Sequence, residues 1–188
     1  GDVLTDNLDK WTIEFLSYCE SFSMNAHNLQ FYDENGSVVI FSRYGEYDHP
    51  ANEIQFKMID VPFYGSNTYE PKKWNHIALT NDGAVIKLYK NGVLDFTADF
   101  PEPGKKISLR KFELRQGNDG SISEFRFWNV VRSQAEISHN MWAVNPKTEG
   151  LVTYWKMNEG GGSVFHDMTG NGRDATITRS GTWKDQVF

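Results

Sequence analysis

Cysteine is almost absent from this chain of 188 residues, which contains Cys19 alone. A single cysteine excludes an intrachain disulfide and a cysteine-based zinc cluster. Cys19 falls in the apolar run FLSYC, with no basic neighbour that would favour a reactive thiolate. We therefore expect it to be a small buried hydrophobe, in a fold held together by its hydrophobic core.

The chain also lacks an excess of positive charge and any long apolar run. Its 19 Lys and Arg are scattered among 25 Asp and Glu, and the net charge of −6 argues against a nucleic-acid partner. No apolar run approaches the length of a membrane span. The first residues contain no signal peptide, so an export signal or lipid anchor is expected upstream of Gly1. Residues 1–7 are interpreted as a linker or a cloning remnant.

Long helical patterns are scarce as well, and short strand-like runs occupy most of the sequence. The clearest is the stretch 73–100, where Asn81-Asp82-Gly83 and Asn91-Gly92 separate three apolar runs. Such turns tolerate the positive φ that tight hairpins require. Ile77 and Leu79 alternate with polar residues at the two-residue period of a half-buried strand. This stretch predicts three consecutive antiparallel strands.

Strands are predicted over most of the chain, with a single helix. The strand-like runs are 11–18, 37–44, 53–59, 75–80, 85–90, 93–100, 106–114, 121–128, 151–157 and 174–178. So many short strands without alternating helices indicate an all-β sandwich or barrel. One helix is predicted near 134–141, because Ser133 and Glu136 form a capping-box pattern. Ile137 and Met141 then lie one turn apart on one face of it.

Catalytic motifs are missing. A glycoside hydrolase needs two carboxylates that flank the scissile bond, and Glu14 and Glu124 each stand alone in a predicted strand. Glu53 and Asp60 are seven residues apart, on opposite faces. All four are expected to be exposed. The histidines are dispersed, and no Gly-x-Ser-x-Gly elbow, His-Glu-x-x-His or phosphate loop occurs. We predict that the chain is not an enzyme.

One glycine-rich turn offers oxygen ligands to a metal. Asp167, Asn171 and Asp174 could contribute to a structural calcium site, because Ca²⁺ prefers carboxylate and amide oxygens. The alternative is that Asp167 and Asn171 accept hydrogen bonds from the backbone amides of the turn itself. The second interpretation is favoured.

Four tyrosines lie in two stretches that read as loops, RYGEYDHPANE and VPFYGSNTYEPKK. Sugars are bound by aromatic rings that stack on C–H faces and by polar groups that bond to hydroxyls. The tyrosines therefore define, with two neighbouring asparagines, a candidate glycan site of Tyr44, Tyr47, Asn52, Tyr64, Asn67 and Tyr69. The alternative is that these tyrosines only pack the loops against the sandwich.

The order of several motifs resembles a known family. The segments WNHIALTNDGAVIKLYKNG, SEFRFWNVVRSQAEI and LVTYWKMNEGGGSVFHDMTGNGRDATI follow one another as in laminin-G-like, concanavalin A-like jelly-roll domains. The resemblance covers about residues 8–178 and implies a single domain over 1–188, built as two packed antiparallel sheets. Many members begin with an extra strand whose Phe-Asp-Gly-like motif helps to bind calcium, and here only GDVLTDNLD precedes Trp11.

The resemblance also implies a role. The relatives are C-terminal modules of surface lipoproteins in glycan-utilising Gram-negative bacteria. We therefore expect a non-catalytic carbohydrate-binding or adhesive module, monomeric, at the outer-membrane surface, outside the cell or in the periplasm, with a glycan or a surface protein as its partner. A structural spacer or protein-interaction domain is the alternative. A glycoside hydrolase on the same fold is the third possibility.

Overall fold

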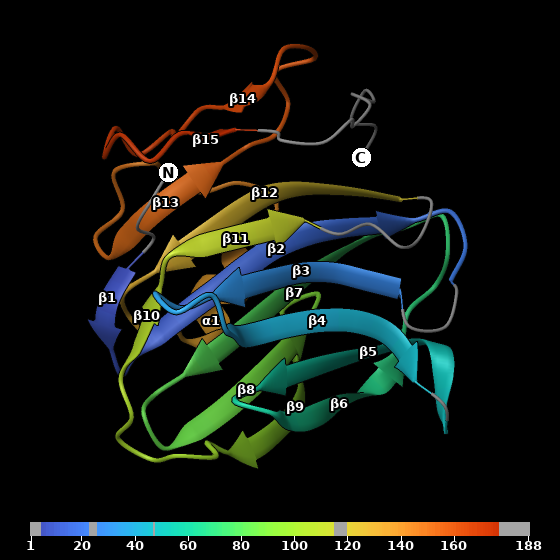
Figure 1. Ribbon diagram of the computed structural model, residues 1–188. Coiled ribbons are helices and arrows are strands. Elements are labelled where there is room, and N and C mark those ends of the chain that lie inside the picture. Colours follow the sequence, from blue (N-terminus) through green and yellow to red (C-terminus); the bar gives the residue numbers. More distant parts are fainter. Residues whose placement is uncertain (1–4, 23–25, 47, 115–119, 177–188) are drawn as a thin grey trace.

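The computed structural model describes residues 5–22, 26–46, 48–114 and 120–176, and two antiparallel sheets dominate it (Figure 1). The five-stranded sheet runs β11 (Lys111–Leu114), β3 (Ala26–Tyr32), β4 (Val38–Glu46), β5 (His49–Met58) and β6 (Val61–Thr68). The six-stranded sheet runs β13 (Leu151–Trp155), β12 (Gly120–Trp128), β2 (Trp11–Cys19), β7 (Trp74–Asn81), β8 (Val85–Lys90) and β9 (Val93–Asp99). These layers confirm the predicted all-β jelly-roll sandwich.

Two short pairs complete the strands. β1 (Thr5–Leu8) pairs with β10 (Ile107–Leu109), and β14 (Val164–Phe165) pairs with β15 (Ala175–Thr176). In the part of the chain that the structure describes, no helix reaches the length and apolarity that crossing a membrane requires.

The hydrophobic core lies between the two large sheets. Successive side chains of a strand point to opposite faces, and one set from each strand is apolar. Ile13 and Phe15 of β2 and Ile77 and Leu79 of β7 are fully buried in this core. Cys19 belongs to it too, 3% exposed and not in a disulfide, as expected. An aromatic cluster lies at one end, with ring centroids 5.0–6.0 Å apart, made of Phe31, Phe112, Phe125 and Trp155.

The predicted double hairpin is confirmed. β7, β8 and β9 are consecutive antiparallel neighbours. Asn91 and Gly92 have φ of 49° and 77°, the left-handed values that a tight turn requires. A Cβ on Gly92 would lie 2.7 Å from the Cβ of Ser138, so a glycine is needed there also for the approach of the helix.

The helix α1 (Gln134–His139) is shorter than predicted but has the expected cap. Ser133 and Glu136 form both hydrogen bonds of the capping box. Ile137 is buried against Ala78 and Tyr89. These two residues alternate with the core residues of β7 and β8, so α1 packs on the outer face of the six-stranded sheet.

Some strands differ from the prediction. The run 106–114 is two strands in different sheets, separated at Arg110, whose N–H donates to the carbonyl of Tyr32 at 2.8 Å. The two stretches interpreted as loops are largely strands, because β4 extends to Glu46, β5 begins at His49 and β6 begins at Val61. Pro62 is tolerated because β6 is an edge strand, where a missing N–H costs no ladder bond.

Candidate functional site

The outer face of the six-stranded sheet is covered. Residues 129–150, here called the cover segment, include α1 and run between β12 and β13. Val130 accepts a hydrogen bond from Thr12 Oγ1 at 2.9 Å, and Arg132 N donates to the same hydroxyl at 3.0 Å. Trp128, Leu151 and Tyr154 form a small cluster with Val144 of the cover segment. This side of the sandwich is therefore largely closed to a large ligand.

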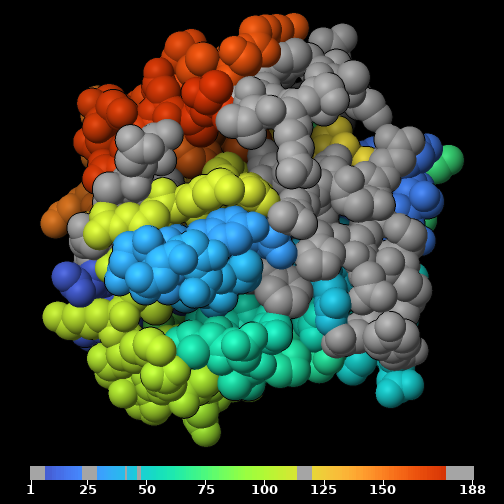
Figure 2. Space-filling model, in the orientation of Figure 1, coloured from blue at the N-terminus to red at the C-terminus, as the bar shows by residue number. Residues whose placement is uncertain are grey.

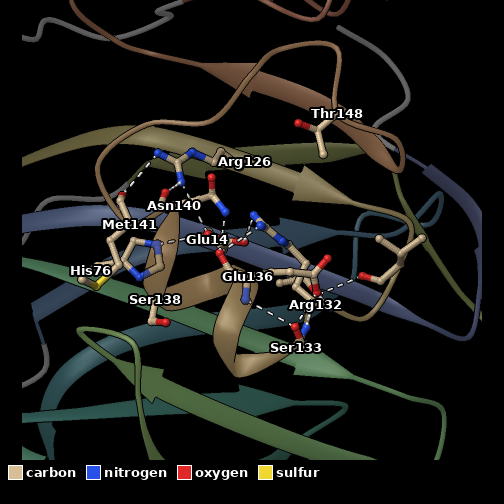
Figure 3. Close-up of polar contacts among 12 residues, drawn as sticks. Glu14, His76, Arg126, Arg132, Ser133, Glu136, Ser138, Asn140, Met141 and Thr148 are labelled. Carbon is tan, nitrogen blue, oxygen red and sulfur yellow. Dashed lines mark hydrogen bonds and ion pairs between the residues drawn. The ribbon is translucent and has the colours of Figure 1, made fainter.

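A buried ionic network lies beneath the cover segment (Figure 3). Glu14 is 0% exposed and sits at its centre. Its Oε1 accepts from Arg132 Nη1 at 3.0 Å, and its Oε2 lies 3.1 Å from His76 Nε2 and 3.5 Å from Arg126 Nη1. Arg126 also donates to Glu124 Oε2 at 2.7 Å. The expectation that Glu14 and Glu124 are exposed is wrong, since Glu124 is only 6% exposed.

The protonation states of the network follow from burial and charge. Burial raises the pKa of Glu14, but the hydrogen bond from His76 and the charges of Arg132 and Arg126 outweigh it and hold this pKa below its usual range. Burial lowers the pKa of His76, and the two guanidinium groups lower it further. Burial raises the pKa of Tyr154, whose hydroxyl therefore stays protonated and donates to Glu124. At neutral pH, Glu14 is ionised and His76 is neutral.

The network holds structure together and offers no open catalytic groove. Arg126 donates to the carbonyls of Asn140 at 2.6 Å and Met141 at 3.3 Å, and Arg132 donates to the carbonyl of Glu136 at 3.0 Å. The carbonyls of Asn140 and Met141 are thus bound to a guanidinium of the sheet, and that of Glu136 to a guanidinium of the cover segment that is itself paired with Glu14. The two buried glutamates share one guanidinium instead of facing each other across a substrate cleft.

The outer face of the five-stranded sheet has a different character. Its outward residues are polar or aromatic, because the inward positions of the same strands supply the core. Register places Arg43 opposite Gln55 and Gln55 opposite Tyr64, in one row across β4, β5 and β6. A second row brings together Glu113, Gln30, Phe41 and Lys57. We call the following set the polar face: Gln30, Tyr32, Arg43, Gln55, Lys57, Tyr64 and Glu113. Gln30 and Gln55 are buried, at 7% and 2% exposed, and the other five are half-buried.

Side chains of the polar face bind one another across the strands. The Tyr32 hydroxyl lies 2.8 Å from Gln30 Oε1 and 3.0 Å from Glu113 Oε2. Arg43 Nε donates to Gln55 Oε1. Lys111 Nζ lies 5.0 Å from the centre of the Tyr32 ring. In Figure 2, blue β3 and yellow-green β11 lie side by side at the front of the molecule.

A stacked pair lies at the other end of this face. The rings of His49 and Tyr64 are parallel within 3°, with centroids 3.7 Å apart. His49 Nδ1 is 2.9 Å from Glu53 Oε2, so the contact with this carboxylate also fixes the position of the imidazole ring. One face of the Tyr64 ring is therefore covered by His49, and the ring is fixed in direction.

The predicted cluster of exposed rim tyrosines is wrong for two of its members. Tyr44 is 1% exposed and Tyr69 is 0% exposed, and their rings pack against each other with centroids 5.5 Å apart. Tyr44 lies in β4 and points inward, where its hydroxyl is 3.3 Å from Ser17 Oγ. For both residues the alternative interpretation holds, because they anchor their segments in the core.

The other predicted residues have separate surroundings. Asn52 is half-buried, and it donates through Nδ2 to the carbonyl of Tyr69 at 2.9 Å. Asn67 is exposed and donates to Asp95 Oδ1. Tyr64 lies on the polar face. Tyr47 lies outside the described residues. The five candidates that the structure describes therefore do not form one surface.

In the turn that the sequence offered as a calcium site, the carboxylates accept hydrogen bonds from groups of the protein itself. Asp167 Oδ1 accepts from Tyr154 N at 3.1 Å and from Thr169 N at 3.2 Å, and Oδ2 accepts from Arg173 N at 3.3 Å. The Thr169 hydroxyl lies within 2.8 Å of both oxygens. The local hydrogen bonding expected for Asp167 as the alternative is confirmed.

The two remaining predicted ligands are also hydrogen-bonded, although Asn171 donates to a carbonyl where it was expected to accept from backbone amides. Asp174 Oδ1 accepts from Asp167 N at 2.8 Å, and its Oδ2 is 3.1 Å from His166 Nδ1. Asn171 Nδ2 donates to the carbonyl of Val152 at 3.0 Å. Among the residues that the structure describes, no three His, Cys, Asp or Glu side chains are grouped to hold a metal ion. The arrangement of this turn does not fit a calcium ion.

The sequence carried a signal for the polar face that the loop interpretation hid. In EIQFKMI, the buried Ile54, Phe56 and Met58 alternate with Gln55 and Lys57. The same alternation across β3 and β6 would have placed Gln30 and Tyr64 outward, had those strands been recognised.

Comparison with known proteins assigns the family. Residues 2–138 match the laminin-G-type model of the concanavalin A-like lectin/glucanases superfamily. The chain belongs to this superfamily. Mouse pappalysin-1 is 34% identical over 95 residues, which are 46% of this chain and 6% of pappalysin-1. The human protein is 32% identical over 83 residues, 39% of this chain and 5% of its own. The chain thus spans a small part of these curated relatives.

Solved structures share the fold. A candidate carbohydrate-binding protein of Bacteroides ovatus superposes with a TM-score of 0.74 at 22% identity, over 95% of this chain and 57% of its own. A pentraxin of Limulus polyphemus gives 0.56 at 14% identity, over 70% of this chain and 69% of its own. Domain 4 of an extracellular arabinanase of Geobacillus stearothermophilus, solved with arabinotriose, gives a TM-score of 0.53 at 13% identity, over 73% of this chain and 69% of its own. The fold is that of carbohydrate-binding and lectin-like domains.

Proposed function

We propose that the chain is a non-catalytic carbohydrate-binding module whose polar face binds a glycan. The observation that carries the proposal is the contrast between the two sheets. The six-stranded sheet is covered by residues 129–150, whereas the five-stranded sheet carries the half-buried Tyr32, Arg43 and Tyr64. A guanidinium and tyrosine rings on an ordered sheet are groups that bind sugar hydroxyls and C–H faces.

The ordered side chains of the polar face favour it over a loop as the binding site. Tyr32 is fixed by its hydroxyl bonds, Arg43 by Gln55, and Tyr64 by the stacked His49. Side chains that are already ordered lose little conformational entropy when a ligand binds. The arabinotriose seen with the arabinanase domain supports an oligosaccharide as the class of ligand.

The carboxylates favour binding without hydrolysis. Glu14 and Glu124 are buried under the cover segment. On the five-stranded sheet, Glu113 belongs to β11 and Glu53 to β5, which are separated by β3 and β4. Three strand spacings amount to about 14 Å, beyond the roughly 5–10 Å that separates the two carboxyl groups of glycosidases.

The proposed setting is the surface of a bacterial cell, as a monomeric module of a larger exported protein. The resemblance to surface lipoproteins and the fold of the Bacteroides ovatus protein support it. The bonding of Asp167 and Asp174 supports binding that needs no calcium ion. A chelator should therefore leave glycan affinity unchanged.

A glycan array, with arabinotriose among its probes, tests the proposal. We expect the wild-type protein to bind at least one oligosaccharide, and Tyr64→Ala and Tyr32→Ala to lose that binding. Trp142→Ala is the matched control, because Trp142 is 50% exposed but belongs to the cover segment. Binding that survives both tyrosine substitutions would contradict the site. No binding to any glycan would favour the spacer or protein-interaction role.

A further inference from the structure

We propose that His76 is a pH switch: when its imidazole gains a proton, the cover segment separates from the outer face of the six-stranded sheet. The proposal is independent of glycan binding. It rests on the way in which residues 129–150 are attached and on the charges that surround His76 beneath them (Figure 3).

Two guanidinium groups take part in the attachment of the cover segment, beside the hydrogen bonds of Thr12 and the packing of Val144. Arg126 rises from β12 to the carbonyls of Asn140 and Met141, and Arg132 reaches the carbonyl of Glu136. Both groups are also ion-paired to Glu14. Their positions, and with them the position of the helix C-terminus, are therefore set by the balance of charge around that carboxylate.

Apolar contacts add little at the helix itself. Ile137 is the buried residue of α1, which is six residues long. It packs on Ala78 and Tyr89. Isolated helices of this length are unstable in water, so α1 depends on its attachment to the sheet.

The network is electrically balanced only while His76 is neutral. The charged groups on the neighbouring strands are Glu14 of β2 and Glu124 and Arg126 of β12, and Arg132 reaches in from the cover segment. Two carboxylates and two guanidinium groups sum to zero. Tyr154 of β13 faces Glu124 as a neutral hydroxyl.

Among the described residues, the titratable groups of α1 make no hydrogen bond to His76, although the bonds to Ser133 and then the charge of Arg132 lower the pKa of Glu136. Glu136 turns its carboxylate to Ser133, at 2.8 Å from the backbone N–H and 2.6 Å from the hydroxyl. His139 is exposed, and its Nδ1 is 2.7 Å from the carbonyl of Ala135. Neither faces His76.

A proton on His76 breaks the balance in two ways. His76 is 1% exposed, and its Nε2 already bonds to Glu14, so the proton goes to Nδ1. Nδ1 has no hydrogen-bond partner in the described structure, and its N–H would be a buried donor left unsatisfied. The proton also adds a third positive charge beside two guanidinium groups, at a ring that is 1% exposed.

Separation of the cover segment relieves both effects, because it admits water to the imidazolium. The pKa of His76 is lowered in the closed form, chiefly by burial. It returns toward 6.5 when the ring is hydrated. Protons therefore favour the open form, and the effect appears in acid. The core lies on the opposite face of β2 and β7, so the sandwich itself remains folded.

Amide hydrogen exchange of the whole chain at about pH 5 and pH 7.5 tests the switch. After correction for the intrinsic pH dependence of exchange, amides of residues 133–150 should lose protection in acid by about tenfold or more, the change that one pKa unit of difference between the two forms produces. Amides of β2 and β7 should keep theirs. Equal loss over the whole chain would mean global unfolding and overturn the proposal.

Two histidine variants identify the titrating group. His76→Gln keeps a donor to Glu14 but cannot be protonated, so it should abolish the acid-induced loss of protection. His139→Gln, the matched control on α1, should leave it as in the wild type. If His76→Gln opens in acid like the wild type, the carboxylates are responsible and the proposal is wrong. If that variant does not fold, an NMR titration of the wild-type His76 ring must show a pKa below 6.5 that coincides with the opening.

Discussion

Arg132 and Glu14 form an ion pair of 3.0 Å, although 118 positions separate them and both are at most 4% exposed. Glu14 lies on β2, and Arg132 directly precedes α1. The pair therefore couples the sandwich to the segment that covers it.

Removal of Arg132 should destabilise the fold strongly. Arg132→Ala leaves Glu14 buried with one of its cations lost, and breaking a buried pair in this way costs about 3–5 kcal/mol. Urea unfolding measures the change. Lys105→Ala is the control, because its pair with Glu102 is exposed and worth at most about 1 kcal/mol. Similar losses in the two variants would contradict the buried role of Arg132.

Stability should fall as the solution becomes acidic. The pKa values of both Glu14 and His76 are lowered in the folded state. The unfolded chain then binds more protons than the folded chain, so the free energy of unfolding decreases with decreasing pH. The loss of stability that His76 causes begins below about pH 6.5, and the loss that Glu14 causes begins below about pH 4.5, the ordinary pKa values of the two groups. Urea unfolding at a series of pH values measures it, and stability that rises from pH 7 to pH 5 would refute this account.

Two glycines should respond oppositely to the same substitution. A Cβ on Gly120 would lie 2.2 Å from the carbonyl oxygen of Tyr18, so Gly120→Ala must displace the backbone of β2. We expect a loss of about 1–3 kcal/mol, as for other overpacked sites. Gly161 has open space and no positive φ, so Gly161→Ala should be neutral or slightly stabilising. Thermal unfolding of both variants checks the contrast, which an undisturbed Gly120→Ala would remove.

Asp95 should connect the edges of the two sheets. It lies on β9 and accepts from Ser66 N of β6 at 3.1 Å and from the side chain of Asn67. Asp95→Ala should cost about 0.5–1.5 kcal/mol, the net contribution of a hydrogen bond whose exposed donors can turn to water. It should also accelerate exchange of the Ser66 amide. Asp99→Ala, exposed at the end of the same strand, should do neither. Unchanged exchange at Ser66 would show that Asp95 is not the connection.

Local patterns sufficed to predict the double hairpin of β7, β8 and β9 and the helix α1. The turns at Asn81–Gly83 and Asn91-Gly92 and the capping box at Ser133 depend on neighbours within a few residues. The strands that the sequence did not predict, β3 and β6, depend on distant partners instead. β3 was not recognised, and β6 contains Pro62 and Gly65, so their strand character comes from pairing with β4 and β5.

The candidate site could be predicted far less well, for a geometric reason. Tyr44 and Tyr64 were both expected to be exposed, but a strand alternates its side chains, and only the actual strand limits show that Tyr44 points inward and Tyr64 outward. In the sequence, Glu14 stands at a polar position in the alternation of its strand, as an exposed residue would. Nothing near it in the sequence shows that residues 129–150 return to cover it.

The most direct test of the central claim is an ¹⁵N–¹H NMR titration of the protein with arabinotriose and with the oligosaccharides selected by the glycan array. The account predicts that the largest shifts occur at the amides of the polar face, above all the backbone amides of Tyr32, Arg43 and Tyr64, which are its half-buried members. Shifts confined to the cover segment or to the turn 167–174, or none with any glycan, would contradict it.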